Sequence, residues 1–200
     1  MLLVISGPSG AGKSTLCRQV LNNLEGIEFS VSHTTRNKRK GEIEGKDYYF
    51  VSQEEFKSMI KENELAEWAV VHGHYYGTSK REIEKKGAKG DLLLDIDIQG
   101  AKQIKEKFKK AVFIFIMPPH FRDLKRRLKT RGQENLASVQ RRLEVARKEI
   151  RYYHQFDYVV INEELKQAVQ ELESIIRSTR CSLDSRKMEI LSILRSFTGS

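Results

Sequence analysis

Cysteine, proline and tryptophan are scarce in this sequence. Of its 200 residues, two are cysteines, three are prolines and one is tryptophan. Cys17 and Cys181 stand far apart and belong to no metal-ligand spacing, so the sequence predicts no zinc site. Two distant cysteines are also typical of a reducing compartment, and we expect a cytoplasmic protein.

Long apolar runs are absent as well. The apolar run over residues 2–5 is far shorter than the roughly 20 residues that a membrane-spanning helix needs. No segment has the charged, apolar and small-residue regions of a signal peptide. We therefore expect no membrane partner.

The sequence has too few acidic residues to balance its basic ones. It contains 36 lysines and arginines against 27 aspartates and glutamates, a formal net charge of +9. A basic balance favours anionic ligands, and nucleotides are one such class. Nucleic acid is the rival partner, but the basic residues are not interleaved with aromatic stacking platforms and no nucleic-acid-binding motif is present. We therefore expect no nucleic-acid partner.

The strongest motif present is a phosphate-binding loop. An unbroken apolar run over residues 2–5 precedes it, and apolar residues at helical spacing follow it over residues 13–24. Strand, glycine-rich turn and helix are the context that this pattern requires. The loop reads G-x-x-x-x-G-K-S-T and consists of Gly7, Pro8, Ser9, Gly10, Ala11, Gly12, Lys13, Ser14 and Thr15.

Loops of this kind bind polyphosphates. Their backbone N–H groups turn towards the ligand, and the following helix N-terminus adds positive potential. Lys13 is expected to reach the β- and γ-phosphates and the Ser14 hydroxyl to ligate Mg²⁺. The alternative is a glycine-rich turn with an exposed lysine. We predict that the chain binds ATP with Mg²⁺.

Strand and helix patterns alternate along most of the chain. Buried strands are predicted at residues 92–94, 112–116 and 158–161, and helices at residues 99–108, 121–129, 136–153 and 165–176. This alternation is typical of an α/β fold with a parallel sheet. Ligands of such sheets bind at the carboxyl ends of the strands.

Residues 30 to 86 break the alternation. They are polar and rich in tyrosine and glycine, and they contain two predicted capping boxes, at Ser52-Gln53-Glu54-Glu55 and Ser79-Lys80-Arg81-Glu82. We interpret them as a small inserted subdomain with short antiparallel strands. An insertion of this size provides a place for a second substrate.

The insertion contains candidate ligands for a monophosphate. Arg36 and Arg39 carry planar guanidinium groups that suit phosphate oxygens, and Tyr48 and Tyr76 add hydroxyls. Glu67 is a carboxylate with no helical lysine four residues later. The alternatives are a solvated basic turn, tyrosines of the core and a surface glutamate.

Six segments of this sequence, in this order, resemble the guanylate kinase family over residues 2 to about 176. The resemblance implies an α/β P-loop nucleoside monophosphate kinase fold, with a parallel-sheet core, an inserted GMP-binding α+β subdomain and a helical lid. It also implies the Mg²⁺-dependent reaction of ATP and GMP to ADP and GDP. The segments are Gly-Pro-Ser-Gly-Ala-Gly-Lys-Ser-Thr (7–15), Ser-Val-Ser-His-Thr-Thr-Arg (30–36), Gly-Lys-Asp-Tyr-Tyr-Phe (45–50), Glu-Trp-Ala (67–69), Tyr-Tyr-Gly-Thr (75–78) and Leu-Asp-Ile-Asp-Ile-Gln-Gly (94–100).

The resemblance assigns roles to matching residues in the insertion. The ligands of the GMP phosphate are Arg36, Arg39, Tyr48 and Tyr76. The groups that read guanine are Ser32, Glu67, Thr78 and Asp97. Guanine offers N–H donors at N1 and N2, which a carboxylate accepts, whereas adenine presents an acceptor at N1.

Asp95 ends the predicted strand over residues 92–94, where phosphate-loop enzymes keep the carboxylate of the Mg²⁺ shell. We expect Asp95 to act there through a water molecule, and Asp97 to face the acceptor nucleotide. The alternative for either residue is a carboxylate that caps the next helix.

The resemblance also places two arginines on the donor side, in a basic helical segment. Arg131 and Arg142 match lid arginines that reach the transferring phosphates, and with Lys13 and Arg36 they complete the predicted catalytic charges. Their alternative is a solvated helix face. Asn162 matches a contact to the donor base, with a helix N-cap as an equally good alternative.

These assignments divide the chain into predicted regions. A guanylate kinase-like domain spans residues 1–180, with its core at 1–30, 87–118 and 152–180, the GMP-binding insertion at 31–86 and the lid at 119–151. A helical tail follows at 181–200, which packs on the core or on a second subunit, so that a monomer and a homodimer both remain open. The family usually has proline where this chain has Lys38.

Two other functions remain open at this point. Guanylate-kinase-like binding modules of scaffold proteins lack a working phosphate loop, whereas this chain has Lys13 and Ser14. A small kinase with another acceptor would keep the phosphate loop but would not need Glu67 beside two arginines and a tyrosine.

Overall fold

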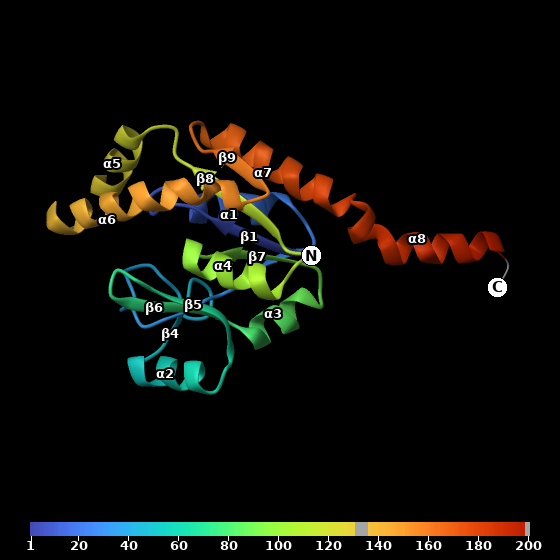
Figure 1. The fold of residues 1–200 in the computed structure, drawn as a ribbon, viewed down its shortest axis with the longest axis horizontal. Helices are drawn as coiled ribbons and strands as arrows, with labels where there is room; N and C mark the ends of the chain where they lie inside the picture. Colours follow the sequence, from blue (N-terminus) through green and yellow to red (C-terminus); the bar gives the residue numbers. More distant parts are fainter. Residues whose placement is uncertain (131–135, 199–200) are drawn as a thin grey trace.

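The core of the protein is a five-stranded parallel sheet. The computed structural model describes residues 1–130 and 136–198. The sheet order is β2 (Ile27–Phe29), β7 (Asp91–Asp95), β1 (Leu2–Ser6), β8 (Val112–Met117) and β9 (Tyr158–Ile161). Figure 1 labels β7, β1, β8 and β9 of this sheet. The four strands predicted from apolar runs are confirmed. β2 was not predicted, because its three residues, Ile27-Glu28-Phe29, carry too little apolar pattern.

Helices cover both faces of this sheet. Successive strand residues point to opposite sides, and both sides carry apolar side chains that pack against helices. Leu3 and Ile5 of β1 pack with α1 (Lys13–Asn23) and α7 (Leu165–Arg180) in one buried cluster. Val4 of the same strand packs with α3 (Lys80–Gly87) and α4 (Ile98–Lys107) in the other. The predicted α/β fold with a parallel sheet is therefore confirmed.

A second, four-stranded sheet lies below the first in Figure 1. Its order is β4 (Tyr49–Phe50), β3 (His33–Thr34), β6 (His74–Ser79) and β5 (Leu65–Val71), and α2 (Gln53–Lys61) belongs to the same region. β6 pairs antiparallel with β3 and β5, as expected, but β3 and β4 pair parallel. The expectation of antiparallel strands alone is thus wrong for one pair, because residues 35–48 return the chain to the same end of the sheet.

The two predicted capping boxes differ in the structure. Ser52 and Glu55 make the full reciprocal box at the start of α2. Ser79 accepts a hydrogen bond from the Glu82 backbone, but the Glu82 carboxylate accepts from the Val31 backbone at 3.0 Å and pairs with Lys86 at 2.6 Å. The second capping box is therefore wrong for the Glu82 side chain. This carboxylate links α3 to the segment that joins the two sheets.

The basic segment forms a pair of helices, α5 (Phe121–Thr130) and α6 (Leu136–Glu149). Leu124 and Leu128 of α5 form a small buried cluster with Val139, Leu143 and Ala146 of α6. The helix predicted over residues 136–153 ends at Glu149 and continues as a 3₁₀ turn, Ile150–Gln155. Arg131 lies outside the described residues.

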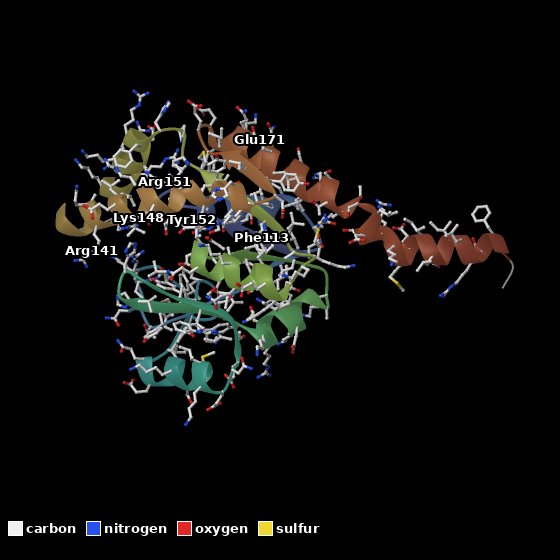
Figure 2. All side chains as sticks on the ribbon, viewed as in Figure 1. Phe113, Arg141, Lys148, Arg151, Tyr152 and Glu171 are labelled. Atoms are coloured by element: carbon white, nitrogen blue, oxygen red, sulfur yellow. The ribbon has the colours of Figure 1, made fainter. Side chains whose placement is uncertain are left out.

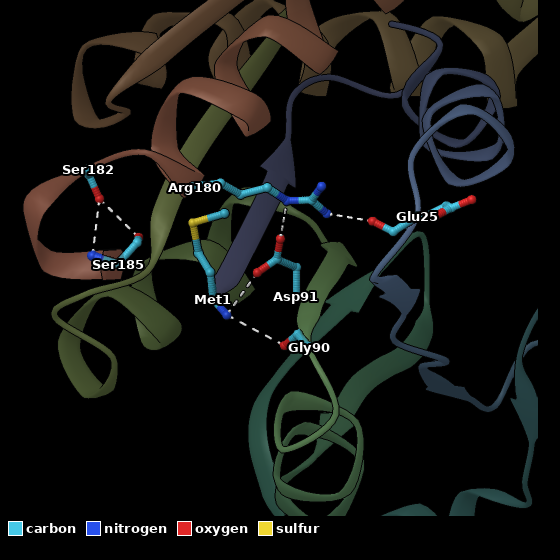
Figure 3. Close-up of polar contacts among 7 residues, drawn as sticks. All are labelled: Met1, Glu25, Gly90, Asp91, Arg180, Ser182 and Ser185. Atoms are coloured by element: carbon cyan, nitrogen blue, oxygen red, sulfur yellow. Dashed lines mark hydrogen bonds and ion pairs between the residues drawn. The ribbon is translucent and has the colours of Figure 1, made fainter. Parts of the chain in front are cut away.

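The end of α7 is tied to the start of the sheet. Asp91 of β7 accepts from Arg180 Nε at 2.7 Å and pairs with the amino group of Met1 at 3.1 Å, and Arg180 also donates to the carbonyl of Glu25 (Figure 3). After this anchor α8 (Leu183–Thr198) extends away from the body (Figure 1), with Met188 76% and Phe197 84% exposed. Among the helices within residues 1–130 and 136–198, none is both long and apolar enough to cross a membrane.

Candidate active site

A cleft of about 400 Å³ lies between the two sheets. The phosphate loop and the carboxyl end of β7 form one wall, where ligands of parallel sheets are expected. Residues of the second sheet and of the segments that connect its strands form the opposite wall. Predicted site residues lining it are Gly7, Ser9, Gly10, Gly12, Lys13, Ser14, Ser32, Arg36, Arg39, Tyr48, Glu67, Tyr76, Asp95, Asp97 and Arg142.

The phosphate loop wraps around the ammonium group of its own lysine. Lys13 Nζ donates to the Gly7 carbonyl at 2.7 Å. Gly7 has a φ of +140°, and a Cβ there would lie 2.3 Å from the Ile116 carbonyl of β8, so no other residue fits against the strand. The loop thus holds a positive charge at the N-terminus of α1, where backbone dipoles add to it.

Asn162, which follows β9, supports this loop. Its Nδ2 donates to the Ala11 carbonyl at 2.7 Å, and its side chain is buried. Helix α7 instead begins after Glu164, so the capping alternative for Asn162 is wrong. No local sequence pattern predicts this contact, because 151 positions separate the partners.

Arg142 reaches the loop from α6. Its Nη2 donates to Ser9 Oγ at 2.7 Å, and the residue is 9% exposed. Arg127 of α5 also reaches the loop, where it donates to the carbonyls of Ala11 at 3.4 Å and Asn162 at 2.9 Å. Arg141, Lys148 and Arg151 are exposed instead; Figure 2 labels them along α6 and the 3₁₀ turn that follows. The structure thus identifies two arginines of the basic segment, Arg142 and Arg127, that contact the loop. Sequence spacing alone does not identify them.

Ser14 and Asp95 bring two oxygen ligands together. Ser14 Oγ donates to Asp95 Oδ2 at 2.8 Å, because Asp95 ends β7 beside β1 and the loop. Mg²⁺ takes oxygen ligands and keeps several waters, so one hydroxyl and one carboxylate beside a phosphate site fit it. In the described part of the chain, no three His, Cys, Asp or Glu side chains gather into an all-protein metal site.

Asp97 caps α4 and also faces the cleft. Its Oδ1 accepts from the Gly100 backbone at 2.8 Å and its Oδ2 from Gln99 Nε2 at 3.1 Å. Burial raises the pKa of this carboxyl, although the hydrogen bond from Gly100 lowers it. The capping alternative is therefore confirmed for Asp97, which also lines the cleft beside Asp95.

Two arginines and two tyrosines gather on the opposite wall. The Arg36 guanidinium lies 5.4 Å from the ring of Tyr48, whose ring centroid is 5.9 Å from that of Tyr76. Burial raises the pKa of the Tyr48 hydroxyl, so it remains a hydrogen-bond donor. Arg39 also lines the cleft. The four groups can together donate to an anion.

Glu67 lines the cleft and is only 3% exposed. It stands opposite Thr78 in the β5–β6 register, and Thr78 Oγ1 lies 3.4 Å from Ser32 Oγ. Burial raises the pKa of Glu67 to about 7, although a hydrogen bond from Thr78 opposes the shift. A buried carboxylate beside two hydroxyls can read the edge of a base.

The cleft contains further residues that the sequence did not single out: Val71, His72, His74, Ile96 and Glu149. His72 and Gly73 both have positive φ and connect β5 to β6 as a two-residue hairpin turn. Such a turn favours glycine at its second central position, but His-Gly is not one of the Asn-Gly or Asp-Gly pairs that signal it strongly. No sequence signal marks Glu149 as a cleft residue. The pKa of its carboxyl is raised by burial, although the charge of nearby Lys13 opposes the shift.

Comparisons with known proteins agree with this geometry. A family model described as guanylate kinase matches residues 1–179. Guanylate kinase from Geobacter sulfurreducens is 50% identical over 182 residues, which cover 90% of each chain. Guanylate kinase from Clostridium tetani is 48% identical over 192 residues, which cover 96% of this chain and 92% of that one.

Solved structures give the same result. Guanylate kinase from Anaplasma phagocytophilum superposes with a TM-score of 0.76 at 37% identity, covering 91% of this chain and 87% of that one. Shikimate kinase from Bacteroides thetaiotaomicron, at 16% identity and a TM-score of 0.52, shares the fold alone. With a family match over residues 1–179 and half-identical relatives over nine tenths of its length, the chain belongs to the guanylate kinase family.

Proposed function

We propose that this cleft transfers the γ-phosphoryl group of ATP to GMP, giving ADP and GDP. The observation that carries the proposal is that one cleft has a phosphate loop on one wall and two arginines, two tyrosines and a buried glutamate on the other. Donor and acceptor phosphates then meet between Lys13 and Arg36. The cleft is formed within one chain, so a monomer and a homodimer both fit.

On the donor side, the loop from Gly7 to Thr15 binds the ATP phosphates, and Lys13 places its charge on the β- and γ-phosphates. Ser14 and Asp95 would hold Mg²⁺, with Asp95 acting through water. When bound, the ion neutralises charge on the phosphate oxygens. Asn162 donates to the Ala11 carbonyl, so its main proposed role is to support the loop, and its contact with the donor base is the lesser role.

On the acceptor side, the phosphate of GMP binds Arg36, Arg39, Tyr48 and Tyr76. Guanine N1–H and N2–H donate to Glu67, and the hydroxyls of Ser32 and Thr78, with Asp97, complete the reading of the base. Adenine leaves the buried carboxylate without donors, which is a strong basis for rejection. The acceptor phosphate, with a second pKa of about 6, is already ionised at neutral pH, so no protein base is needed.

Transfer then depends on positioning, positive charge and exclusion of water. Arg142 is proposed to move its guanidinium from Ser9 to the transferring phosphoryl group, because the two sites adjoin. Arg131, outside the described residues, is proposed to act with it.

The proposal is tested by following the γ-phosphorus of labelled ATP. With GMP and Mg²⁺ present, the label is expected to appear in the β-position of GDP. Label released as inorganic phosphate would indicate an ATPase, and label on another acceptor would refute GMP as the substrate.

Replacing Asp95 with asparagine is expected to raise the Mg²⁺ concentration for half-maximal activity by about tenfold, since the neutral amide keeps the shape but loses the charge. The measurement is a Mg²⁺ titration at saturating ATP and GMP. Asp184→Asn, at an exposed carboxylate on α8, is the matched control and should leave the titration unchanged. An unchanged titration for Asp95→Asn would contradict the metal assignment.

Gly100→Ala is expected to raise the KM for GMP by about tenfold or more. A Cβ at Gly100 would lie 2.2 Å from Glu67 Oε2, so the carboxylate must shift, and a shift of about 1 Å is costly at a reading group. Gly87→Ala in α3 is the control, because a Cβ there meets nothing within 4 Å. Equal KM values for GMP in the two variants would show that the position of the Glu67 carboxylate does not determine GMP recognition.

A further inference from the structure

Glu42 makes two short contacts with the arginine pair of the acceptor wall. Its Oε1 lies 2.7 Å from Arg36 Nη2, and its Oε2 accepts the backbone N–H of Arg39 at 2.8 Å. The side chains of Arg36 and Glu42 are only 10% and 19% exposed. One carboxylate therefore fixes both a guanidinium and the turn that carries the second arginine.

The pair is ionised in the folded protein. Burial opposes charge on Glu42, but hydrogen bonds from Arg36 and from the Arg39 backbone outweigh it and lower the pKa of the carboxyl. Burial also opposes charge on Arg36, but hydrogen bonds with Glu42 and Tyr76 outweigh it and raise its pKa. The carboxylate and the guanidinium thus hold one another in place before any ligand is present.

The contacts require a carboxylate in particular. Both partners of Glu42 are N–H donors, and only an ionised carboxyl offers an acceptor oxygen to each. A carboxamide satisfies one partner and turns its own N–H₂ towards the other. The Arg36 guanidinium carries five donors, more than Glu42 and the Asn37 carbonyl accept, so it can still bind phosphate oxygens.

We propose that Glu42 is a positioning residue for the acceptor phosphate, which sets the Arg36 guanidinium and the Arg39 turn in their binding arrangement before GMP arrives. The inference rests on the proposed function, since it names how that acceptor site is preorganised. Preorganised guanidinium groups lose less side-chain freedom when they bind an anion. The segment from Arg36 to Lys40 contains four cations, which would otherwise repel one another.

The opposite role is also physically coherent and predicts the opposite sign. If Glu42 occupied the place of the phosphate as a competing anion, its neutralisation would tighten GMP binding. The contacts favour positioning, because one oxygen is bound to the Arg39 backbone and not only to the cationic side chain. The sign of the change in GMP affinity therefore decides between the two roles.

The experiment measures the dissociation constants of GMP and guanosine by calorimetry, and the kinetic constants for GMP and ATP, in the full chain. Glu42→Gln is compared with Glu42→Asp and with Glu44→Gln, which removes the same charge from an exposed residue two positions later. Guanosine has the base but no phosphate, so it reports on the rest of the site. Thermal unfolding checks that each variant folds.

For Glu42→Gln, the Kd and KM for GMP are expected to rise by about tenfold or more, since hydrogen bonds to charged groups are lost. The Kd of guanosine and the KM for ATP should stay within about twofold, and kcat should fall less than KM rises. Glu42→Asp should recover part of the affinity, and Glu44→Gln should match the unmodified protein.

Tighter or unchanged GMP binding by Glu42→Gln would overturn the positioning role, as would an equal loss of guanosine affinity. If Glu42→Gln does not fold, Glu42→Asp decides in the same way, by weaker GMP binding with unchanged guanosine binding. Failure of the unmodified protein to bind GMP would instead overturn the proposed function itself. That failure is recognisable because it needs no variant.

Discussion

Replacing Lys13 with alanine is expected to lower kcat by about 10³-fold or more. Its ammonium group is held over the phosphate loop by the Gly7 carbonyl at 2.7 Å, where the β- and γ-phosphates would lie. Charge placed where it develops in the transition state contributes most to phosphoryl transfer. The measurement is the steady-state release of ADP with saturating ATP, Mg²⁺ and GMP.

The matched control is Lys89→Ala, at an exposed lysine between α3 and β7. It should retain the activity of the unmodified protein. Thermal unfolding separates lost charge from a collapsed loop, because Lys13 also satisfies the carbonyl of Gly7. A folded Lys13→Ala variant with more than about a tenth of the original kcat would contradict the proposed donor site.

Replacing Glu67 with glutamine is expected to raise the KM for GMP by about 100-fold, with a smaller effect on kcat. In the proposed complex the carboxylate accepts two donors from guanine, whereas a carboxamide would turn its own N–H₂ towards one of them. The pKa of Glu67 is raised by burial to about 7, and only the ionised form accepts both donors. In the unmodified protein kcat/KM for GMP should therefore fall as the pH drops below about 7.

The control is the pH profile of the variant, which has no carboxyl at position 67. Between pH 6 and 8, Glu67→Gln should show a flatter dependence of kcat/KM than the unmodified protein. Normal phosphorylation of GMP by the variant, with an unchanged KM, would show that Glu67 does not read the base.

The same substitution is expected to stabilise the protein without ligand. The pKa of Glu67 is raised in the folded state from 4.5 to about 7, so its favourable contribution is complete below pH 4.5 and is lost as the pH rises through 7. At pH 8 the buried charge costs about 3 kcal/mol, from 1.36 kcal/mol per pKa unit. Thermal unfolding of Glu67→Gln at pH 8 should occur at a higher temperature than that of the unmodified protein, with little difference at pH 4.

Local patterns were sufficient to predict four of the five strands of the core sheet. The apolar runs in β1, β7, β8 and β9 identify strands that are buried on both faces, and the glycine spacing identifies the loop after β1. Ser52 and Glu55 predict the start of α2 because both partners lie within four residues. β2 escaped prediction because three residues do not establish a period.

Contacts between distant segments were not predictable in the same way. Asn162 with Ala11, and Glu82 with Val31, join residues whose proximity depends on the whole fold. Sequence spacing also could not choose among the basic residues of the segment, whereas the structure shows that Arg142 contacts Ser9 and Arg127 contacts Ala11. The roles of the cleft residues remain predictions that the variants above test.

The most direct test of the account offers GMP, AMP, CMP, UMP and dTMP in parallel to the unmodified protein, with ATP and Mg²⁺, in a coupled assay of ADP release. The buried Glu67 beside Thr78 and Ser32 predicts turnover with GMP and at most traces with the other four. Turnover with a different nucleotide would keep the phosphate loop and contradict the acceptor site. No turnover with any of them, despite tight binding of GMP, would contradict catalysis and leave a binding module.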